Sequence, residues 1–256
     1  MQKIPGCSRK HRNMLLSTLS SDACKLMCPH LRLVYLHQGA ILCKPDIQSE
    51  YAYFPLDCFI SLNRFMEDGS SVSVALVGKE GVIGICHLLG GKSMPYTAVN
   101  QTSGYALQVR SDALTEAFNR SEKFRESLLL YVQALVAQIG LNAACNRHHT
   151  LSDQLARLLL LIADRLPTNE INLTQENLAS LLGVRRERIN RAAVKLQDEG
   201  KISYGRGRVK ILDLEKLSRQ CCNCHETIRT EFDRLLTIEP DLDPCDQIAD
   251  LQKRFG

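Results

Sequence analysis

The sequence predicts an α+β protein with a strand-rich first half and a helix-rich second half. Between residues 32 and 109, Gly, Pro and Asp separate short runs of β-branched and aromatic residues, which is typical of strands. Residues 111–147 have apolar residues at helical spacing, and residues 173–212 contain two short helical segments joined by a glycine. The 256 residues, of which 45% are hydrophobic and 23% charged, allow one large or two ordinary domains and exclude wholesale disorder.

A helical lead-in of about 30 residues is expected before the strands, because its apolar residues recur at roughly helical spacing. The expected strands are Leu33–Leu36, Tyr51–Phe54, Phe59–Phe65, Ser71–Val77 and Tyr105–Val109. Asp68-Gly69 predicts a tight hairpin, since glycine tolerates a positive φ. Val72, Val74 and Leu76 alternate with smaller residues, as in a strand with one buried face. Such short, regularly spaced strands indicate a sandwich, a jelly roll or a barrel.

Residues 111–147 predict a long helix with two adjacent apolar stripes. The first stripe consists of Leu128, Tyr131, Leu135, Gln138 and Asn142, and the second of Leu129, Val132, Val136, Ile139 and Ala143. We expect one stripe to pack on the strands and the other on the same helix of a second copy, although a monomer with a central helix is the alternative. A polar stretch, Asn146–Ser152, separates this helix from the next apolar helix, Leu155–Leu166.

Residues 173–212 predict a helix-turn-helix followed by a basic hairpin, or wing. Thr174 can cap the first helix, and Gly183 can end it in a tight turn. The second helix is expected from about Arg185 to Glu199, and the wing strands at Lys201–Tyr204 and Arg208–Leu212. The expected buried residues of the two helices are Leu178, Ala179, Leu182, Ile189, Ala192, Ala193 and Leu196.

The charge distribution singles out the same segment. Residues 185–210 contain nine Lys or Arg and three Asp or Glu, whereas the whole chain has a formal net charge of +4. The exposed face of the second helix has the residue types that read bases, because Arg pairs with guanine and Glu accepts from the cytosine amino group. The expected base-reading residues are Arg186, Glu187, Asn190 and Arg191, and the expected phosphate-binding residues are Thr174, Gln175, Arg185, Arg188, Arg206 and Arg208. A solvated basic helix face is the alternative.

The layout resembles the Crp/Fnr family of bacterial transcription regulators over residues 30–215, most specifically in the segment from Gly183 to Arg191. The family's recognition helix has an Arg-Glu pair followed by Arg, which match Arg186, Glu187 and Arg191. The resemblance implies an N-terminal β jelly roll (double-stranded β-helix), a dimerisation helix and a C-terminal winged helix-turn-helix. It also implies a homodimer on a palindrome of double-stranded DNA with TGTGA-like half-sites, and RNA polymerase as a partner. Arg185 departs from the pattern, since relatives often have Ser there, and this puts the helix cap in doubt.

We therefore expect four parts. Residues 1–110 form the sensor domain with its lead-in, 111–147 the dimerisation helix region and 148–215 the DNA-binding domain, while 216–256 form a last helix and an acidic tail. Glu187 and Arg191, four residues apart, are expected to hold each other in position. Ile228, Phe232 and Leu235 are expected to pack the last helix back on the body.

The sensor domain departs from relatives that bind cyclic nucleotides. After the turn Glu80–Gly84, the family's Glu for the ribose hydroxyl falls on Ile85, and its Arg for the cyclic phosphate falls on Tyr96. Burying the phosphate without a cation is costly, so cyclic AMP and cyclic GMP are not expected as cofactors, and the effector is not identified. The candidate effector-pocket residues are Ile85, His87, Tyr96 and Thr97.

The eleven cysteines are expected to be reduced, because their number is odd and the N-terminus has no export signal. The N-terminal Cys7, Cys24 and Cys28 are spaced too openly for the cluster of the iron–sulfur members of the family. The weak metal-ligand candidates are Cys145 and His148 after the long helix, and Cys222 and Cys224 after the wing, which together can bind zinc if they meet. Structural cysteines are the preferred interpretation. A redox- or metal-sensing regulator of the same fold is the alternative.

Other function classes are disfavoured. Residues 32–109 contain only two histidines, His37 and His87, too few for a cupin-like enzyme, and there is no nucleophile motif, P-loop or dinucleotide fingerprint. A ligand-binding module without DNA binding is disfavoured by the recognition helix. No membrane span is expected, because the best apolar run, Leu155–Ala163, is too short, and we expect a cytoplasmic protein.

Overall fold

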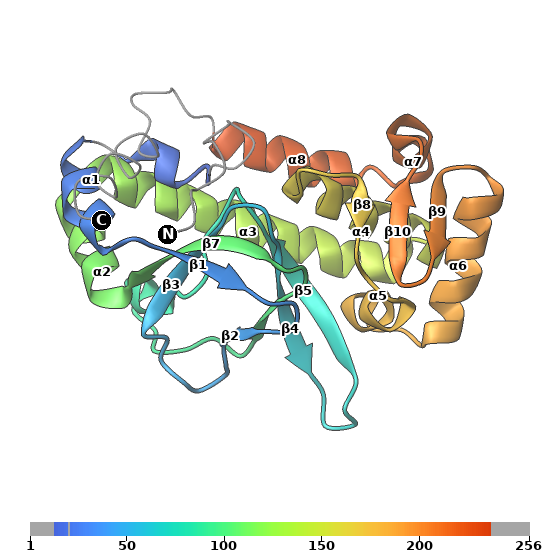
Figure 1. Cartoon of the computed structure of the whole chain (residues 1–256), viewed down its shortest axis with the longest axis horizontal. Coiled ribbons are helices and arrows are strands. Elements are labelled where there is room, and N and C mark those ends of the chain that lie inside the picture. The colour runs from blue at the N-terminus through green and yellow to red at the C-terminus, as the bar shows by residue number, and fades with distance from the viewer. Residues whose placement is uncertain (1–12, 20, 237–256) are drawn as a thin grey trace.

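The structure is a computed structural model that describes residues 13–19 and 21–236. Its axis is the long helix α3 (Glu122–His148), with a roll of strands on one side and helix α8 (Cys224–Leu235) along the other (Figure 1). Helices α5 (Gln175–Leu182), α6 (Arg186–Asp198) and α7 (Leu214–Gln220) lie with the wing at one end of the molecule, and α1 (Ser21–Met27) and α2 (Ser111–Arg120) lie at the other. The predicted order of roll, long helix and helical C-terminal part is therefore confirmed.

Two antiparallel sheets form the roll. The first has the order β1 (Arg32–Leu36), β7 (Gly104–Arg110), β3 (Tyr51–Pro55), and the second has the order β2 (Ile41–Cys43), β6 (Thr97–Asn100), β4 (Ile60–Phe65), β5 (Ser71–Val77). Phe54 of β3 and Ile60 of β4 are fully buried in the common core. All five predicted strands are present within one or two residues at their ends. The sequence analysis missed β2 and β6, which are only three and four residues long.

The hairpin between β4 and β5 forms where it was predicted, with Gly69 at φ +80° in the turn. The expected single buried face of β5 is wrong. Ser73 and Ala75 are buried, whereas Val72 and Val74 are only half-buried. Both faces of β5 are covered, because α3 packs against this strand and helix α5 (Gln175–Leu182) packs beside its start.

The lead-in consists of three short helical segments, η2 (Leu16–Thr18), α1 (Ser21–Met27) and η3 (Cys28–His30). The expectation of reduced thiols is wrong for Cys24 and Cys28, which form a disulfide. Residues four apart share a helix face, and the two Cα atoms lie 5.2 Å apart, within the range that a disulfide spans. Cys7 lies outside the described residues.

Residues 111–147 form two helices instead of one, α2 (Ser111–Arg120) and α3, because Ser121 caps α3 by accepting from the backbone N–H of Phe124. The polar stretch expected at Asn146–Ser152 is also shorter than predicted. Only His149 and Thr150 separate α3 from α4 (Leu151–Arg165), and Thr150 forms a capping box with Asp153 that starts α4 at once.

Helix α3 is long and apolar enough, by length and composition alone, to cross a membrane, a candidate that the sequence analysis missed. One side of it is bound to the roll. Gln138 accepts from the backbone N–H of Leu76 at 2.9 Å and donates to its carbonyl at 3.1 Å, and Asn142 donates to the carbonyl of Val74 at 2.9 Å. Of the other predicted stripe, Leu129 and Val136 are 46% and 62% exposed, whereas Val132 and Ile139 are half-buried against the core.

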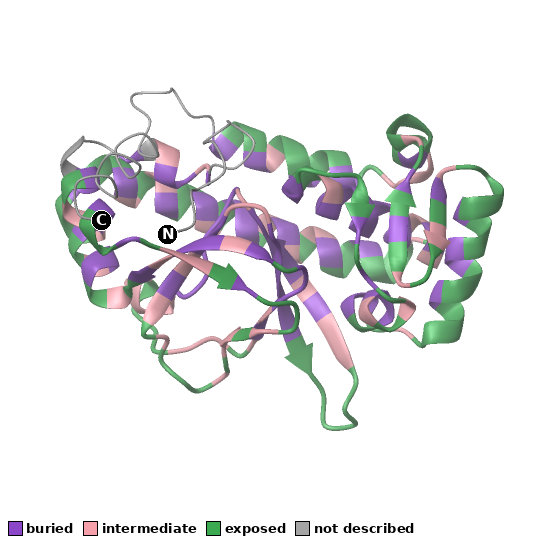
Figure 2. Cartoon of the chain, viewed as in Figure 1, coloured by how far each residue is buried: buried purple, intermediate pink, exposed green. Residues whose placement is uncertain are grey.

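The C-terminal part contains the predicted helix-turn-helix and wing. It consists of α4, β8 (Glu170–Ile171), α5, α6 (Arg186–Asp198), β9 (Ile202–Gly205), β10 (Arg208–Ile211) and α7 (Leu214–Gln220), followed by α8. Strand β8, which the sequence analysis missed, pairs with β10 to widen the wing. Figure 2 shows the buried side of α6 facing the body and its outer side exposed. Ile228, Phe232 and Leu235 of α8 are buried as predicted, and the acidic tail lies outside the described residues.

Candidate nucleic-acid interface

The turn between α5 and α6 is built as the sequence predicts. Thr174 caps α5 through a capping box with Asn177, and Gly183 ends it in the left-handed region at φ +65°. A Cβ at Gly183 would also lie only 3.0 Å from the Cβ of Val72 in the roll. Glycine is therefore favoured here both by the turn and by the close packing against β5. In the capping box the hydroxyl and the backbone N–H of Thr174 both donate to Oδ1 of Asn177, so the predicted phosphate contact would replace one of these bonds.

The first turns of α6 present the residues predicted to read bases. Arg186, Glu187, Asn190 and Arg191 are exposed, whereas Ile189, Ala192, Ala193 and Leu196 are buried against α4 and α5. The side chains of α6 therefore form one apolar face and one polar face, as their spacing in the sequence predicts.

Gln175 of α5 holds two of these side chains in place. Its Oε1 accepts from Nε of Arg186 at 3.3 Å, and its Nε2 donates to Oδ1 of Asn190 at 2.8 Å. The predicted Glu187–Arg191 pair is not formed, since no ion pair or hydrogen bond joins them in this described helix. The sequence analysis assigned Gln175 to a phosphate contact. It missed that Gln175 orients side chains of the recognition helix, because Gln175 lies on α5 and these side chains lie on α6.

The sequence analysis doubted a side-chain cap at the start of α6, because Arg185 stands where relatives often have Ser, and this doubt is confirmed. Arg185 occupies the N-cap position and makes no side-chain cap hydrogen bond. The backbone N–H groups of the first turn of α6 therefore have no side-chain acceptor from this residue. Arg185 and Arg188 are both exposed at this end of the helix.

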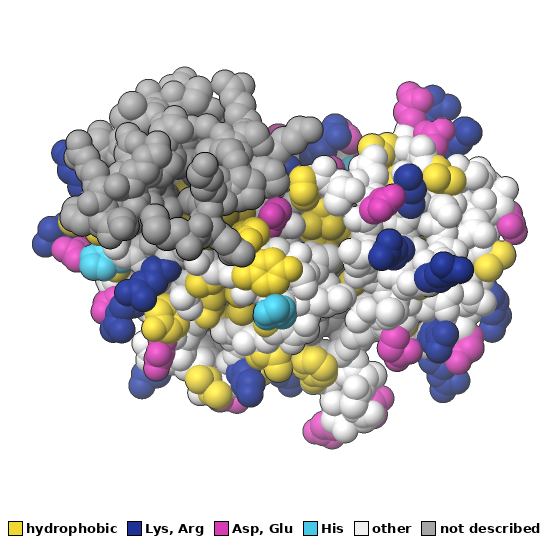
Figure 3. Space-filling model, in the orientation of Figure 1, with side chains coloured by type: hydrophobic (Ala, Val, Ile, Leu, Met, Phe, Trp, Pro, Cys, Tyr) yellow, Lys and Arg dark blue, Asp and Glu magenta, His cyan; other side chains and the backbone are white. Residues whose placement is uncertain are grey.

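The wing carries its basic residues at a tight turn. Arg206 and Gly207 connect β9 to β10 with φ values of +51° and +75°. Two successive positive φ values are the geometry of a type I′ hairpin turn, which places the Arg206 side chain at the tip. Arg206 and Arg208 are exposed, while Lys210 pairs with Glu170 at 3.3 Å. In Figure 3, dark-blue Lys and Arg side chains stand on the end of the molecule that holds α6 and the wing.

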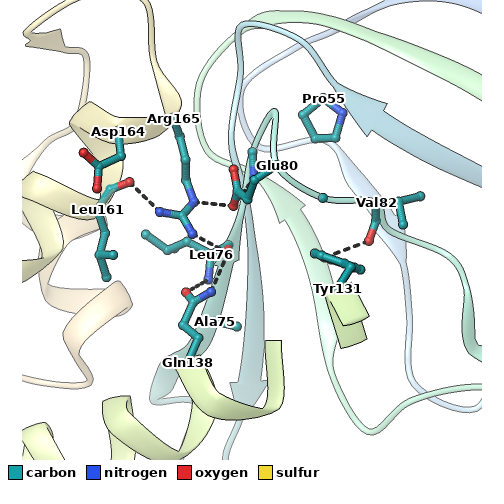
Figure 4. Close-up of polar contacts among 12 residues, drawn as sticks. Pro55, Ala75, Leu76, Glu80, Val82, Tyr131, Gln138, Leu161, Asp164 and Arg165 are labelled. Carbon is teal, nitrogen blue, oxygen red and sulfur yellow. Dashed lines mark hydrogen bonds and ion pairs between the residues drawn. The ribbon is translucent and has the colours of Figure 1, made fainter. Parts of the chain in front are cut away.

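A buried ion pair joins this part of the chain to the roll. Nε of Arg165, at the end of α4, lies 2.8 Å from Oε1 of Glu80, which follows β5, and both side chains are at most 10% exposed (Figure 4). Arg165 also donates to the carbonyls of Leu161 at 2.7 Å and Leu76 at 3.2 Å. Its guanidinium carbon lies 6.0 Å from the centre of the Phe232 ring of α8. One side chain thus contacts the roll, α4 and α8.

The roll contains a small cavity of about 110 Å³ beside α3. Of the four candidate effector residues, Ile85 and Tyr96 line it, while His87 and Thr97 do not. The lining is almost entirely apolar, and its one charged residue, Lys44, is exposed. Four residues of α3 line it too: Val132, Leu135, Val136 and Ile139.

The two predicted groups of metal-ligand candidates, one at the end of α3 and one after the wing, meet in space, but with a different histidine from the predicted one. Cys145, Cys222 and Cys224 converge with His149, not with His148, which is exposed. The sequence analysis chose the wrong histidine. Residues four apart share a helix face, and this spacing favours His149 as the partner of Cys145.

Cys58 lies in the roll, outside this cluster. Burial raises the pKa of Cys58 to about 12, so its thiol is protonated and unreactive at neutral pH.

Comparison with known proteins gives matches to both halves. Residues 33–121 match the family model of the cyclic nucleotide-binding domain, and residues 153–220 match that of the Crp-like helix-turn-helix domain. The global nitrogen regulator of Nostoc sp. is 24% identical over 186 residues, which are 69% of this chain and 83% of that protein.

Solved structures share the fold. FixK2 from Bradyrhizobium japonicum aligns with a TM-score of 0.65 at 17% identity, over 75% of this chain and 98% of that one. A transcriptional regulator of the CRP family from Thermus thermophilus aligns with a TM-score of 0.62 at 19% identity, over 73% and 95% of the two chains.

Proposed function

The chain belongs to the Crp/Fnr family of transcription regulators and is not an enzyme, and from this premise we propose that it binds a palindromic operator in double-stranded DNA as a homodimer. The observation that carries the proposal is the exposed polar face of α6, with Arg186 and Asn190 both held by Gln175. Side chains that are oriented before binding lose less conformational freedom when they contact bases. We place the protein in the cytoplasm with RNA polymerase as a partner, as the family membership implies.

The roles of the basic residues follow from their positions. We assign Arg186, Glu187, Asn190 and Arg191 to base edges in the major groove. The residues assigned to phosphates are Thr174, Gln175, Arg185, Arg188, Arg206 and Arg208. For Gln175, the contacts with Arg186 and Asn190 favour orientation of the recognition helix over a phosphate contact.

The outward stripe of α3 supports the homodimer. Leu129 and Val136 of this stripe are 46% and 62% exposed, although they are apolar. An exposed apolar face of this kind marks an interaction surface, and a second copy of the same helix is complementary to it. We attribute the apolar character of α3 to the face that packs on the roll and to the outward stripe that packs on the second copy, and we propose no membrane partner.

The cavity supports a signal other than a cyclic nucleotide. No buried cation faces it among its lining residues, so a cyclic phosphate would lose its hydration without compensation. We infer a small, largely apolar effector, whose site touches α3 directly. Calorimetric titration with cyclic AMP and cyclic GMP is expected to show no binding, and saturable binding to either would contradict this assignment.

Selection of binding sites from random duplex DNA tests the function. The full-length reduced protein, without added ligand, is expected to enrich a two-fold palindrome whose half-site centres are about 34 Å apart along the helix axis. The control variant Arg229→Ala changes an exposed arginine of α8 and is expected to select the same site. If the ligand-free protein enriches no sequence under reducing conditions and none under oxidising conditions, the proposal is wrong for the ligand-free protein. An asymmetric single site would contradict the dimer.

A further inference from the structure

Four metal-binding side chains converge where the end of α3 meets the start of α8. The ligand atoms of Cys145, His149, Cys222 and Cys224 all lie within 4.8 Å of one another. Sγ of Cys145 is 3.5 Å from Sγ of Cys222, and Sγ of Cys224 is 3.7 Å from Nδ1 of His149. We propose that these four residues form a tetrahedral Cys₃His site for a zinc ion.

The spacing matches the size of such a site. With Zn–S bonds of about 2.3 Å and Zn–N bonds of about 2.1 Å, a tetrahedron has S···S edges of about 3.8 Å and S···N edges of about 3.6 Å. The Cys145–Cys222 distance of 3.5 Å and the Cys224–His149 distance of 3.7 Å are close to these lengths. No two ligand atoms are more than 4.8 Å apart, so the longest edge needs to close by at most about 1 Å.

The backbone fixes both pairs of ligands. Cys145 lies on the last turn of α3, and the backbone N–H of His149 donates to the carbonyl of Cys145 at 3.0 Å, so the two side chains share one helix face. Cys224 is the first residue of α8 and Cys222 lies two residues before it, and α8 packs along α3. Cys145 and Cys224 are buried, and His149 and Cys222 are half-buried. Solvent therefore has limited access to the four ligands, as is typical of a closed structural site.

A buried cation offsets the charge that the site would have. Zinc with three thiolates and a neutral histidine carries one net negative charge. Arg157 of α4 is only 3% exposed. It donates to the side-chain oxygens of Asn142 and Asn146 on α3, while its Nε is buried and has no hydrogen-bond partner in the described part of the chain. An anionic metal centre supplies the counter-charge that this guanidinium otherwise lacks.

The zinc ion would clamp the start of α8 to the end of α3. This is the junction at which the long helix passes into α4 and the DNA-binding part, since only two residues separate α3 from α4. The site is distinct from the cavity in the roll and from the face of α6. Closed coordination by four protein ligands points to a structural role, because no position is left for a substrate.

Metal binding by the full-length protein tests the proposal. Reduced protein loaded with Zn²⁺ and dialysed is expected to retain one zinc per chain by elemental analysis. Replacement by Co²⁺ is expected to give the visible bands of tetrahedral cobalt and a thiolate-to-cobalt charge-transfer band. Cys222→Ser and His149→Ala are expected to lower zinc affinity at least about 100-fold, since even outer-shell changes cost about 10- to 100-fold. Affinity is measured by competition with a chromophoric chelator.

Neighbouring residues provide matched controls. Cys221→Ser and His148→Ala change the same residue types one position away and are expected to bind zinc as the unmodified protein does. The proposal is overturned if the unmodified protein retains no zinc and gives no tetrahedral cobalt spectrum, or if these controls lose as much affinity as the ligand variants. It is also overturned if anaerobically purified protein contains a Cys145–Cys222 disulfide by mass spectrometry. None of these measurements depends on DNA binding, so failure here leaves the proposed function standing.

Discussion

Arg186 and Arg206 are both exposed arginines of the basic segment, yet their surroundings differ. Arg186 begins the recognition helix and is bonded to Gln175, which limits the directions in which its guanidinium points. Arg206 stands at the tip of the wing, and its side chain has no such partner in the described structure. An oriented arginine can pair with one base, whereas a mobile one is suited to phosphates.

Arg186→Ala is expected to weaken binding to the selected operator by about 1–3 kcal/mol and to relax the preference at one base pair, because a bidentate contact is lost. Gel-shift competition with operators mutated one position at a time measures both effects. An equal loss of affinity on every sequence would show that Arg186 does not read a base.

Arg206→Ala is expected to weaken binding to all sequences to the same extent. Losing one phosphate contact should reduce the slope of log K against log salt by about 1, because one fewer counterion is released. Fluorescence anisotropy over a series of salt concentrations, on the operator and on scrambled DNA, gives this slope. A change confined to the operator would assign Arg206 to base reading.

At the scale of elements, local patterns predicted most of the fold. The helix cap at Thr174, the turn at Gly183 and the first stripe of α3 are all encoded by residues near one another in sequence, and all three are confirmed. The failures involve very short elements or partners distant in sequence. The burial of Ser73 and Ala75 depends on residues of α3 and α5 that lie more than 60 positions further along the chain. The choice of His148 over His149 was a different failure, because the four-residue spacing from Cys145 was a local signal that the sequence analysis did not use.

Leu129→Glu is expected to convert the dimer into a monomer, because it places a charge on the outward stripe of α3 where the second copy would pack. Analytical ultracentrifugation measures the change. The matched control is Leu212→Glu, since Leu212 is 53% exposed but lies at the end of the wing, and this variant is expected to remain dimeric. If Leu129→Glu also sediments as a dimer, α3 is not the dimer interface.

At the scale of the whole molecule, direct contacts hold the roll and the DNA-binding part together. Ser71 of β5 and Ser180 of α5 share a hydrogen bond of 2.6 Å, and Gln38 donates to the carbonyl of Asn172 at 3.2 Å. The sequence analysis identified one link between the long helix and the helices that follow it, the polar stretch Asn146–Ser152. The structure adds a second connection, the Glu80–Arg165 pair, whose members are too distant in sequence for any local pattern to predict.

This pair leads to a prediction about the stability of the whole chain. Glu80→Ala removes the carboxylate that faces Arg165 and leaves a guanidinium that is 4% exposed without its counter-charge. Breaking a buried pair in this way costs about 3–5 kcal/mol, so a clear fall in the free energy of unfolding is expected in urea. The control Glu215→Ala breaks an exposed pair with Arg219, which is 75% exposed, and is expected to leave unfolding unchanged.

The double variant Glu80→Ala/Arg165→Met separates an ion pair from simple packing. Removing both charges eliminates the unpaired guanidinium, so the double variant is expected to be more stable than Glu80→Ala alone. If the losses of unfolding free energy from the two single changes add up in the double variant, the carboxylate acts only locally, through its hydrogen bond from the backbone N–H of Gly78 at 3.1 Å. A recovery of stability would show instead that the roll and the DNA-binding part are coupled through this charge pair. A signal received in the roll would then have a route to α4 that bypasses the link between α3 and α4.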